Sequence, residues 1–155
     1  MAVCKNEITK DCSVMEGKMA LPNQYFVGRV GSKFIIALRD EHKILGVKCE
    51  KCDKVFIPPR EYCEKCLSKL DENWVELSDE GVITNYTVVY YSDKHLPRRS
   101  PYILALIKLD GADTPFPHIV EGVDIEDVTA GMKVKAVFAE ETTNTILDID
   151  HFEPV

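Results

Sequence analysis

Four cysteines form the pattern in this sequence that most clearly predicts chemistry. Cys49-Glu-Lys-Cys52 and Cys63-Glu-Lys-Cys66 are two C-x2-C pairs separated by ten residues. Two residues between thiols let one tight turn direct both sulfur atoms at a single ion, and two such turns supply the four thiolates of a tetrahedral zinc site. The sequence therefore predicts one structural zinc ion bound by Cys49, Cys52, Cys63 and Cys66.

A zinc ion held by four thiolates has no coordination position left for water, so this metal is expected to hold its segment folded rather than to catalyse a reaction. Iron in a rubredoxin-like site is an alternative, because four thiolates also bind iron. Two separate dithiols without metal are another. Cys4 and Cys12 lie in a polar N-terminal segment and are interpreted as incidental thiols.

The rest of the chain shows little that resembles a catalytic motif. None of the four histidines has a metal-ligand spacing, Gly28-Arg-Val-Gly31 lacks the Lys-Ser/Thr of a phosphate-binding loop, and no G-x-S-x-G turn occurs. Lys94, Arg98 and Arg99 form a basic cluster in an acidic region, which indicates a contact with an anion such as a phosphate group. A solubilising loop tip is the alternative.

Charge is distributed unevenly along the 155 residues, whose net charge is −7. Residues 71–155 carry 17 acidic and 6 basic side chains, whereas residues 1–48 carry 8 basic and 5 acidic ones. This asymmetry suggests two modules with different neighbours. The acidic second half argues against a general affinity for nucleic acid, which requires clustered Lys and Arg.

The N-terminal residues contain no apolar core of the kind found in secretion signals, and no stretch approaches the ~20 apolar residues of a membrane helix. We therefore expect a cytoplasmic protein. Thiols stay reduced in that compartment, which favours metal binding over disulfides for the cysteines.

The elements that position the cysteines are expected in residues 28–70, after an N-terminal arm over residues 1–27. Ser32 can cap a short helix over about 33–42, although the apolar run Phe34–Leu38 also allows a strand. A strand at 44–47 leads into the first cysteine pair. The segment between the pairs, residues 53–62, is expected to form a small hairpin.

From residue 71 onward the hydrophobic period changes to two. Strands are predicted at 74–77, 81–91, 102–109, 116–120, 132–138 and 146–152, with a capped helical turn at 124–128. Five or six strands with one short helical turn fit a small OB-type barrel over residues 71–155, and a β-sandwich is the alternative. The predicted fold is therefore mainly β: an arm and short helix, a four-Cys zinc ribbon, and a five- to six-stranded barrel.

This combination resembles the family of zinc-ribbon/OB-fold proteins associated with acyl-CoA enzymes. The resemblance extends from about residue 25 to the end of the chain. The residues that carry it are Gly28–Phe34, Ile44–Cys52, Phe56-Ile-Pro-Pro-Arg60, Cys63–Cys66, Trp74, Gly81–Val89, Pro101–Asp110 and Val123–Val134.

The resemblance implies a non-catalytic subunit that helps a thiolase-fold partner to shape its CoA channel. Family members occur with acetoacetyl-CoA thiolase and HMG-CoA synthase, and with sterol side-chain thiolases and aldolases. Within the family, this chain is most similar to small subunits of heteromeric thiolases of the benzoylsuccinyl-CoA type. The implied reaction is thiolytic cleavage of a 3-oxoacyl-CoA, such as benzoylsuccinyl-CoA to benzoyl-CoA and succinyl-CoA in anaerobic toluene degradation.

Thiolases need a nucleophilic cysteine, a base and histidines in a large core, so this short chain is not expected to carry catalytic residues itself. We expect CoA at the interface with the partner. Lys94, Arg98 and Arg99 are the hypothesised phosphate contacts, and Phe56 and Arg60 the hypothesised channel wall. The alternatives are a free-standing acyl-CoA-binding protein and a nucleic-acid-binding zinc-ribbon/OB module.

Overall fold

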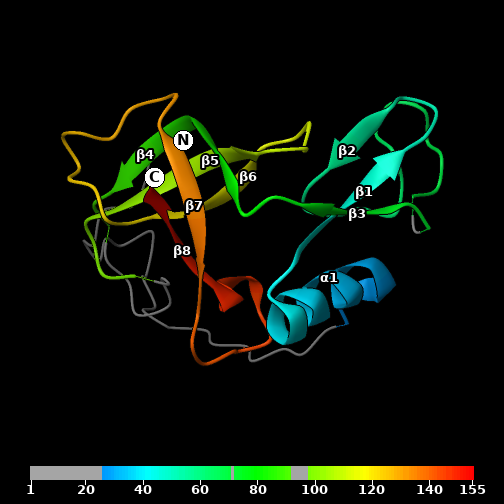
Figure 1. Cartoon of the computed structure of the whole chain (residues 1–155), viewed down its shortest axis with the longest axis horizontal. Helices are drawn as coiled ribbons and strands as arrows, with labels where there is room; N and C mark the ends of the chain where they lie inside the picture. The colour runs from blue at the N-terminus through cyan, green and yellow to red at the C-terminus, as the bar shows by residue number, and fades with distance from the viewer. Residues whose placement is uncertain (1–25, 71, 92–97) are drawn as a thin grey trace, which may run out of the picture.

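A computed structural model describes residues 26–70, 72–91 and 98–155, and it shows a ribbon and a barrel joined along one helix (Figure 1). Most of the predicted arm, Cys4, Cys12 and Lys94 lie outside the described residues. The predicted mainly-β fold is confirmed. None of the described helices has the length and apolar character needed to cross a membrane.

The ribbon is a three-stranded antiparallel sheet in the order β2-β1-β3. Its strands are β1 (Ile44–Cys49), β2 (Lys54–Phe56) and β3 (Trp74–Leu77). The prediction of a hairpin within residues 53–62 is wrong, because only Lys54–Phe56 is a strand and it pairs with β1. Pro58 and Pro59, which lack a backbone N–H, follow directly and stop the strand.

Strand β3 was expected in the barrel, but it pairs with β1 of the ribbon, with Trp74 opposite Val47 and Leu77 opposite Ile44. A period of two identifies a strand without identifying its partner, so the sequence alone could not assign β3 to a sheet. The ribbon therefore has a strand on each side of β1, one before and one after the second cysteine pair.

The barrel is closed in the order β4-β5-β6-β8-β7. Its β6–β8 pair is parallel and its other pairs are antiparallel, which is the arrangement of a five-stranded Greek-key barrel of the OB type. Strand β5 alternates buried and exposed residues, and its inward side chains pack in the core. The strands are β4 (Glu80–Val89), β5 (Tyr102–Leu109), β6 (Phe116–Val120), β7 (Lys133–Phe138) and β8 (Ile149–Pro154).

Two predicted barrel elements differ in detail. The helical turn expected at 124–128 is a hydrogen-bonded turn, in which the N–H groups of Asp127 and Val128 donate to the Asp124 carbonyl at 3.0 and 3.2 Å. The strand expected over 146–152 begins with a 3-10 turn, η1 (Ile146–Asp148), because the Thr145 hydroxyl accepts from the Leu147 N–H and starts a turn there.

Helix α1 (Gly28–Glu41) begins well before the predicted residue 33, so Ser32 lies inside the helix and does not cap it. Val27 precedes the helix without a side-chain cap, and His42 ends it in a left-handed conformation with φ 52°. The helix buries Val30, Phe34, Ala37 and Leu38, and two of these join the core that the barrel residues form. Figure 1 shows α1 beside both β1 and η1, so it connects the two modules.

Candidate metal centre

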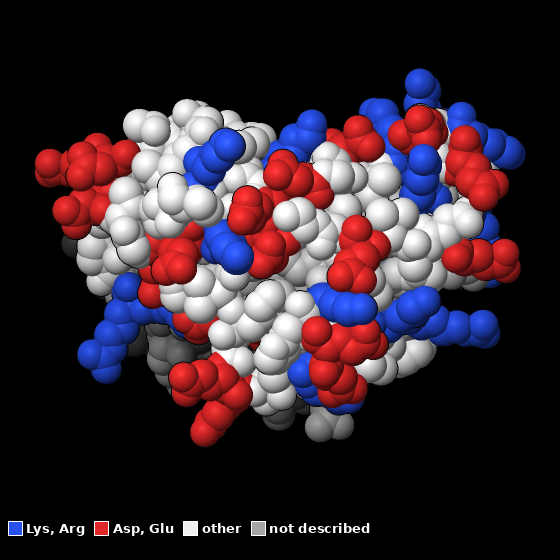
Figure 2. All heavy atoms as spheres, in the orientation of Figure 1, with Lys and Arg blue, Asp and Glu red and all other residues white. Residues whose placement is uncertain are grey.

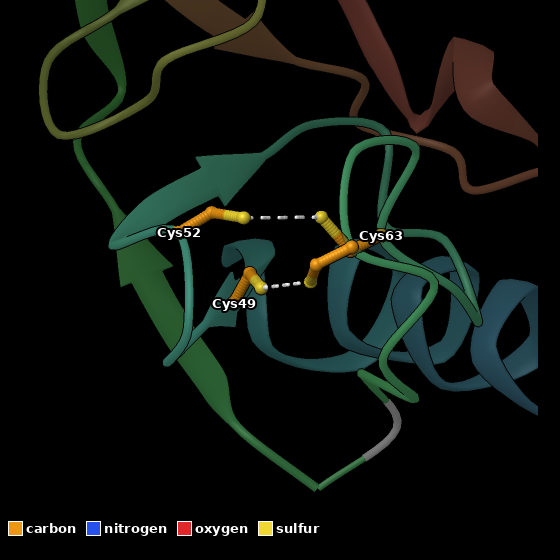
Figure 3. Close-up of side chains that lie close together, drawn as sticks. Cys49, Cys52 and Cys63 are labelled. Carbon is orange, nitrogen blue, oxygen red and sulfur yellow. Dashed lines mark hydrogen bonds between the residues drawn. The ribbon is translucent and has the colours of Figure 1, made fainter.

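The four ribbon cysteines converge on one point. Their sulfur atoms all lie within 4.8 Å of one another, with Cys49 Sγ 3.4 Å from Cys66 Sγ and Cys52 Sγ 3.9 Å from Cys63 Sγ. Figure 3 shows Cys49, Cys52 and Cys63 pointing into the same space. A tetrahedron with Zn–S bonds of ~2.3 Å has edges of about 3.8 Å. The sulfur separations therefore fit zinc, and they far exceed the ~2 Å of a disulfide.

The two cysteine pairs share one backbone geometry. The residue after each second cysteine has a positive φ, 51° at Asp53 and 56° at Leu67. In the second pair, the Leu67 N–H donates to the Cys63 carbonyl at 3.0 Å. Positive φ is uncommon for residues other than glycine, so its recurrence at matched positions shows that the C-E-K-C repeat forms two equivalent turns.

Burial and crowding favour the neutral form of some of these thiols. Hydrogen bonding with Cys66, together with burial, raises the pKa of Cys52 to about 12, and burial raises the pKa of Cys49. Hydrogen bonding to the Ser68 hydroxyl, whose oxygen lies 3.3 Å from the sulfur, lowers the pKa of Cys66 to about 6. A bound divalent cation allows all four thiols to ionise together, and zinc supplies that charge.

A second group of potential metal ligands forms ion pairs with an arginine. Glu121, Asp150 and His151 lie close enough together to share an ion. However, Arg98 Nε lies 2.6 Å from Glu121 Oε1, and its Nη2 lies 2.6 Å from Asp150 Oδ1. The guanidinium therefore compensates the carboxylates, and we interpret the group as a structural ion-pair network.

The hypothesised phosphate contacts Arg98 and Arg99 differ in their ion pairs. Arg98 is held by its two carboxylates and is not free to bind an anion without breaking those bonds. Both arginines line a hollow of about 250 Å³, whose lining also includes Glu121. Lys94 lies outside the described residues. Among the described residues of this cluster, Arg99 is the better placed for an anion.

The hypothesised channel-wall residues also differ from each other. Phe56 is 0% exposed and belongs to the ribbon core, so as folded it has no surface to offer a ligand. Arg60 covers it, with the guanidinium carbon 4.7 Å from the ring centroid and Nη1 2.8 Å from Glu64 Oε2. Arg60 is therefore the only one of the pair on the surface.

Two polar residues are buried in the described part of the chain, and the sequence assigned neither of them a functional role. His118 is packed between Phe116 and Phe152 in the barrel core, and burial lowers its pKa. Asp148 is completely buried, and its Oδ1 accepts from the Thr143 N–H at 2.6 Å. The alternation of β6 could have indicated that His118 points inward. The burial of Asp148 depends on the turn at η1, which no pattern in the sequence predicted.

The surface in Figure 2 carries interspersed acidic and basic side chains, with no continuous basic area on the face shown. Clustered Lys and Arg are the usual footprint of a nucleic-acid-binding surface, and this face carries both signs instead.

A four-thiolate ribbon followed by a closed five-stranded barrel defines a zinc-ribbon/OB-fold protein. Residues 37–72 match the family described as the ChsH2 rubredoxin-like zinc ribbon domain, and residues 74–139 match the ChsH2 C-terminal OB-fold domain. A "DUF35 domain-containing scaffold protein" from Methanocaldococcus jannaschii is 35% identical over 101 residues, which are 65% of this chain and 71% of the relative. The chain belongs to the DUF35 family, with the domain pair of ChsH2.

Two solved structures are similar. A DUF35 protein of unknown function from Sulfolobus solfataricus is 35% identical, with a TM-score of 0.57 over 71% of this chain and 78% of the other. The structure described as "Ltp2-ChsH2(DUF35) aldolase" has a TM-score of 0.63 and 20% identity, covering 84% of this chain and 98% of the other. The second likeness shows the fold alone. Together these findings confirm the family and the fold that the sequence predicted.

Proposed function

We propose that this chain is the non-catalytic zinc-ribbon/OB subunit of a thiolase-fold enzyme and helps to shape its CoA channel. The observation that carries the proposal is the closed four-thiolate site. Four thiolates fill the coordination sphere of a zinc ion. The cysteines, which are the most reactive side chains of the described residues, therefore have a structural role. The relatives add support, since one is named a scaffold protein and another structure pairs ChsH2 with Ltp2 in an aldolase.

The substrate class follows from the resemblance noted in the sequence. We propose thiolytic cleavage of a 3-oxoacyl-CoA, with benzoylsuccinyl-CoA as the first candidate.

In this chain, Arg99 and Arg60 are the described basic residues that we propose to contact CoA at the interface with the partner. Arg99 lines a hollow, and Arg60 lies half-buried over the ribbon core. Lys94 belongs to the same basic cluster in the sequence and to the same proposal, whereas Arg98 is engaged by Glu121 and Asp150.

Affinity purification of the tagged full chain from its source cells tests the partner. We expect a thiolase-fold chain of about 400 residues to co-purify in fixed stoichiometry, identified by mass spectrometry and by the native mass of the complex. The complex, and not this chain alone, should consume CoA in the presence of benzoylsuccinyl-CoA or acetoacetyl-CoA. Recovery of the chain alone with acyl-CoA bound would instead establish the free-standing binding protein.

A further inference from the structure

Strand β4 has an edge that is left open where the barrel closes. Its neighbour β7 pairs only with Glu80–Val82, and the last backbone bonds on that side join Ile83 to Gly131 and Met132 at 2.7 and 2.9 Å. Beyond Ile83, no described backbone group bonds to this edge, although β4 continues along β5 to Val89. An unpaired strand edge presents N–H and C=O groups on which another strand can pair.

A bulge determines which backbone groups face the open edge. The β4–β5 register shifts between Ile83 and Asn85, where the Thr84 hydroxyl donates to the Leu106 carbonyl at 2.8 Å. After the bulge, the Tyr86 N–H donates to the Asn85 side chain at 2.8 Å rather than to β5. Backbone groups alternate between the two edges of an antiparallel strand, so those of Tyr86 and Val88 face the open edge.

The side chains along this edge are suited to pairing. Residues 84–91 read Thr-Asn-Tyr-Thr-Val-Val-Tyr-Tyr, a sequence without charge and rich in β-branched and aromatic residues. Tyr86, Tyr90 and Tyr91 are 38%, 73% and 68% exposed. Natural edge strands are usually protected by lysine, proline or inward-pointing charge, and these eight residues contain none of them.

We propose that this edge pairs with the same edge of a second copy of the chain, antiparallel about a two-fold axis at Val88. In this register Val88 opposes Val88 and Tyr86 opposes Tyr90, so the Val88 N–H and C=O groups of the two copies meet, and pairing at Tyr86 requires its N–H to leave the Asn85 side chain. The cross-strand pairs are uncharged and include two tyrosine pairs, and aromatic pairs of this kind stabilise antiparallel sheets. A register centred on Thr87 would join fewer of the edge-facing groups.

Charge predicts how this association depends on salt. Each copy has a net charge of −7, so two copies repel at long range, whereas the paired strip itself is neutral. Salt screens the long-range repulsion and leaves the strand pairing intact. The contact therefore tightens as salt increases, the opposite of an interface held by ion pairs. It does not depend on the catalytic partner proposed above.

Sedimentation equilibrium of the zinc-loaded full chain tests the proposal. The mass should rise with concentration from 17.5 kDa toward twice that value, and more readily at about 300 mM than at about 20 mM NaCl.

Val88→Pro removes an edge-facing N–H and leaves those that face β5, so it should weaken the dimer by about tenfold or more. Thr87→Lys should weaken it as well, and Thr142→Lys, the same change in an exposed loop, should not. Circular dichroism and zinc content verify that each variant is folded.

Cross-linking tests the register. Directly opposed residues of a hydrogen-bonded pair have Cα atoms ~5.5 Å apart, which is within the range of a disulfide. Val88→Cys should therefore give a dimer joined through position 88 on mild oxidation, identified by mass spectrometry, and Thr142→Cys should not.

A chain that stays monomeric at all concentrations and at both salt concentrations would overturn the proposal, as would a dimer that survives Val88→Pro. Protection of the Tyr86 and Val88 amides by another protein, without self-association, would assign the edge to that protein instead.

Discussion

At the residue scale, the four ribbon cysteines carry most of the chain's chemical character. Two turns with matched positive φ at Asp53 and Leu67 bring the sulfurs together, and a tetrahedral ion fits between them. The spacing of the cysteines was enough to predict this ligand set. The positive φ angles at these two matched positions could not be predicted, because neither residue type is a specific signal for that conformation.

Loss of one ligand should remove the metal. We expect about one zinc per chain in the wild type and little in Cys49→Ser, with a large fall in thermal stability because metal binding is coupled to folding of the ribbon. Elemental analysis and thermal denaturation measure the two effects. Cys12→Ser, the same change in the N-terminal segment, serves as the control. Iron in place of zinc at the same stoichiometry would contradict the zinc assignment.

Arg98 and Arg99 should differ in what they do. Arg98→Ala leaves Glu121 and Asp150 without their cation, so we expect it to lower the free energy of unfolding by about 1–2 kcal/mol. Arg99→Ala should leave stability unchanged and raise the CoA concentration needed for half-maximal activity of the complex. Urea denaturation and CoA titration distinguish them, and an unchanged CoA requirement in Arg99→Ala would remove it from the proposed interface.

His118 should make the fold sensitive to mild acid. Burial lowers the pKa of His118 below the ordinary value near 6.5. As the pH falls through that value, the histidine binds a proton more readily in the unfolded chain than in the folded chain. The free energy of unfolding therefore falls as pH falls through ~6.5, by at most about 1.4 kcal/mol per pH unit. His118→Phe should flatten this slope in urea denaturation between about pH 5.5 and 8, with zinc content checked at each pH. An equal slope in both proteins would show that another group is responsible.

At the element scale, helix α1 joins the modules. It buries Phe34 and Leu38 in the core that the barrel lines, while Lys33 Nζ lies 4.4 Å from the Trp74 ring centroid in β3 and Arg39 Nη1 donates to Asn144 Oδ1 at 3.2 Å. The helix thus contacts both the ribbon and the barrel loop that precedes η1. This arrangement explains why an N-terminal helix belongs to the folded unit.

Truncation of the buried face should be costly. Leu38 is completely buried, so Leu38→Ala should lower the free energy of unfolding by about 2–5 kcal/mol. Ile36, on the same helix, is 46% exposed, and Ile36→Ala should cost about 0.5 kcal/mol or less. Urea denaturation measures both. Equal losses for the two variants would contradict the packing described for α1.

Most elements were predictable because their hydrophobic period is local information. β7 begins with exposed Lys133 and Lys135 alternating with buried Val134 and Ala136, and the sequence shows that alternation directly. The partner of β3 was not predictable, because pairing with β1 depends on tertiary contacts. The start of α1 was missed because Ser32 resembled a cap, whereas the helix begins at a glycine without one. The Arg98 network joins residues distant in sequence, so the arginine could only be interpreted as a free cation.

At the scale of the whole molecule, a four-cysteine ribbon and a closed barrel are joined by one helix, and we propose that together they support a catalytic partner. The net charge of −7 resides mainly in the barrel sequence, and the visible surface mixes both signs. The edge of β4 beyond Ile83 is an uncharged part of the described surface, and we assign it to a second copy. In the proposed complex, this chain supplies shape and a few basic contacts, and the partner supplies the reaction.

Titration of this chain into its purified thiolase-fold partner tests that division of labour most directly. With benzoylsuccinyl-CoA or acetoacetyl-CoA and CoA present, the partner alone should be nearly inactive, and the thiolytic rate should rise and saturate at a fixed ratio of the two chains. The zinc-free Cys49→Ser variant should fail to restore the rate. A partner that is fully active alone, or turnover by this chain alone, would contradict the account.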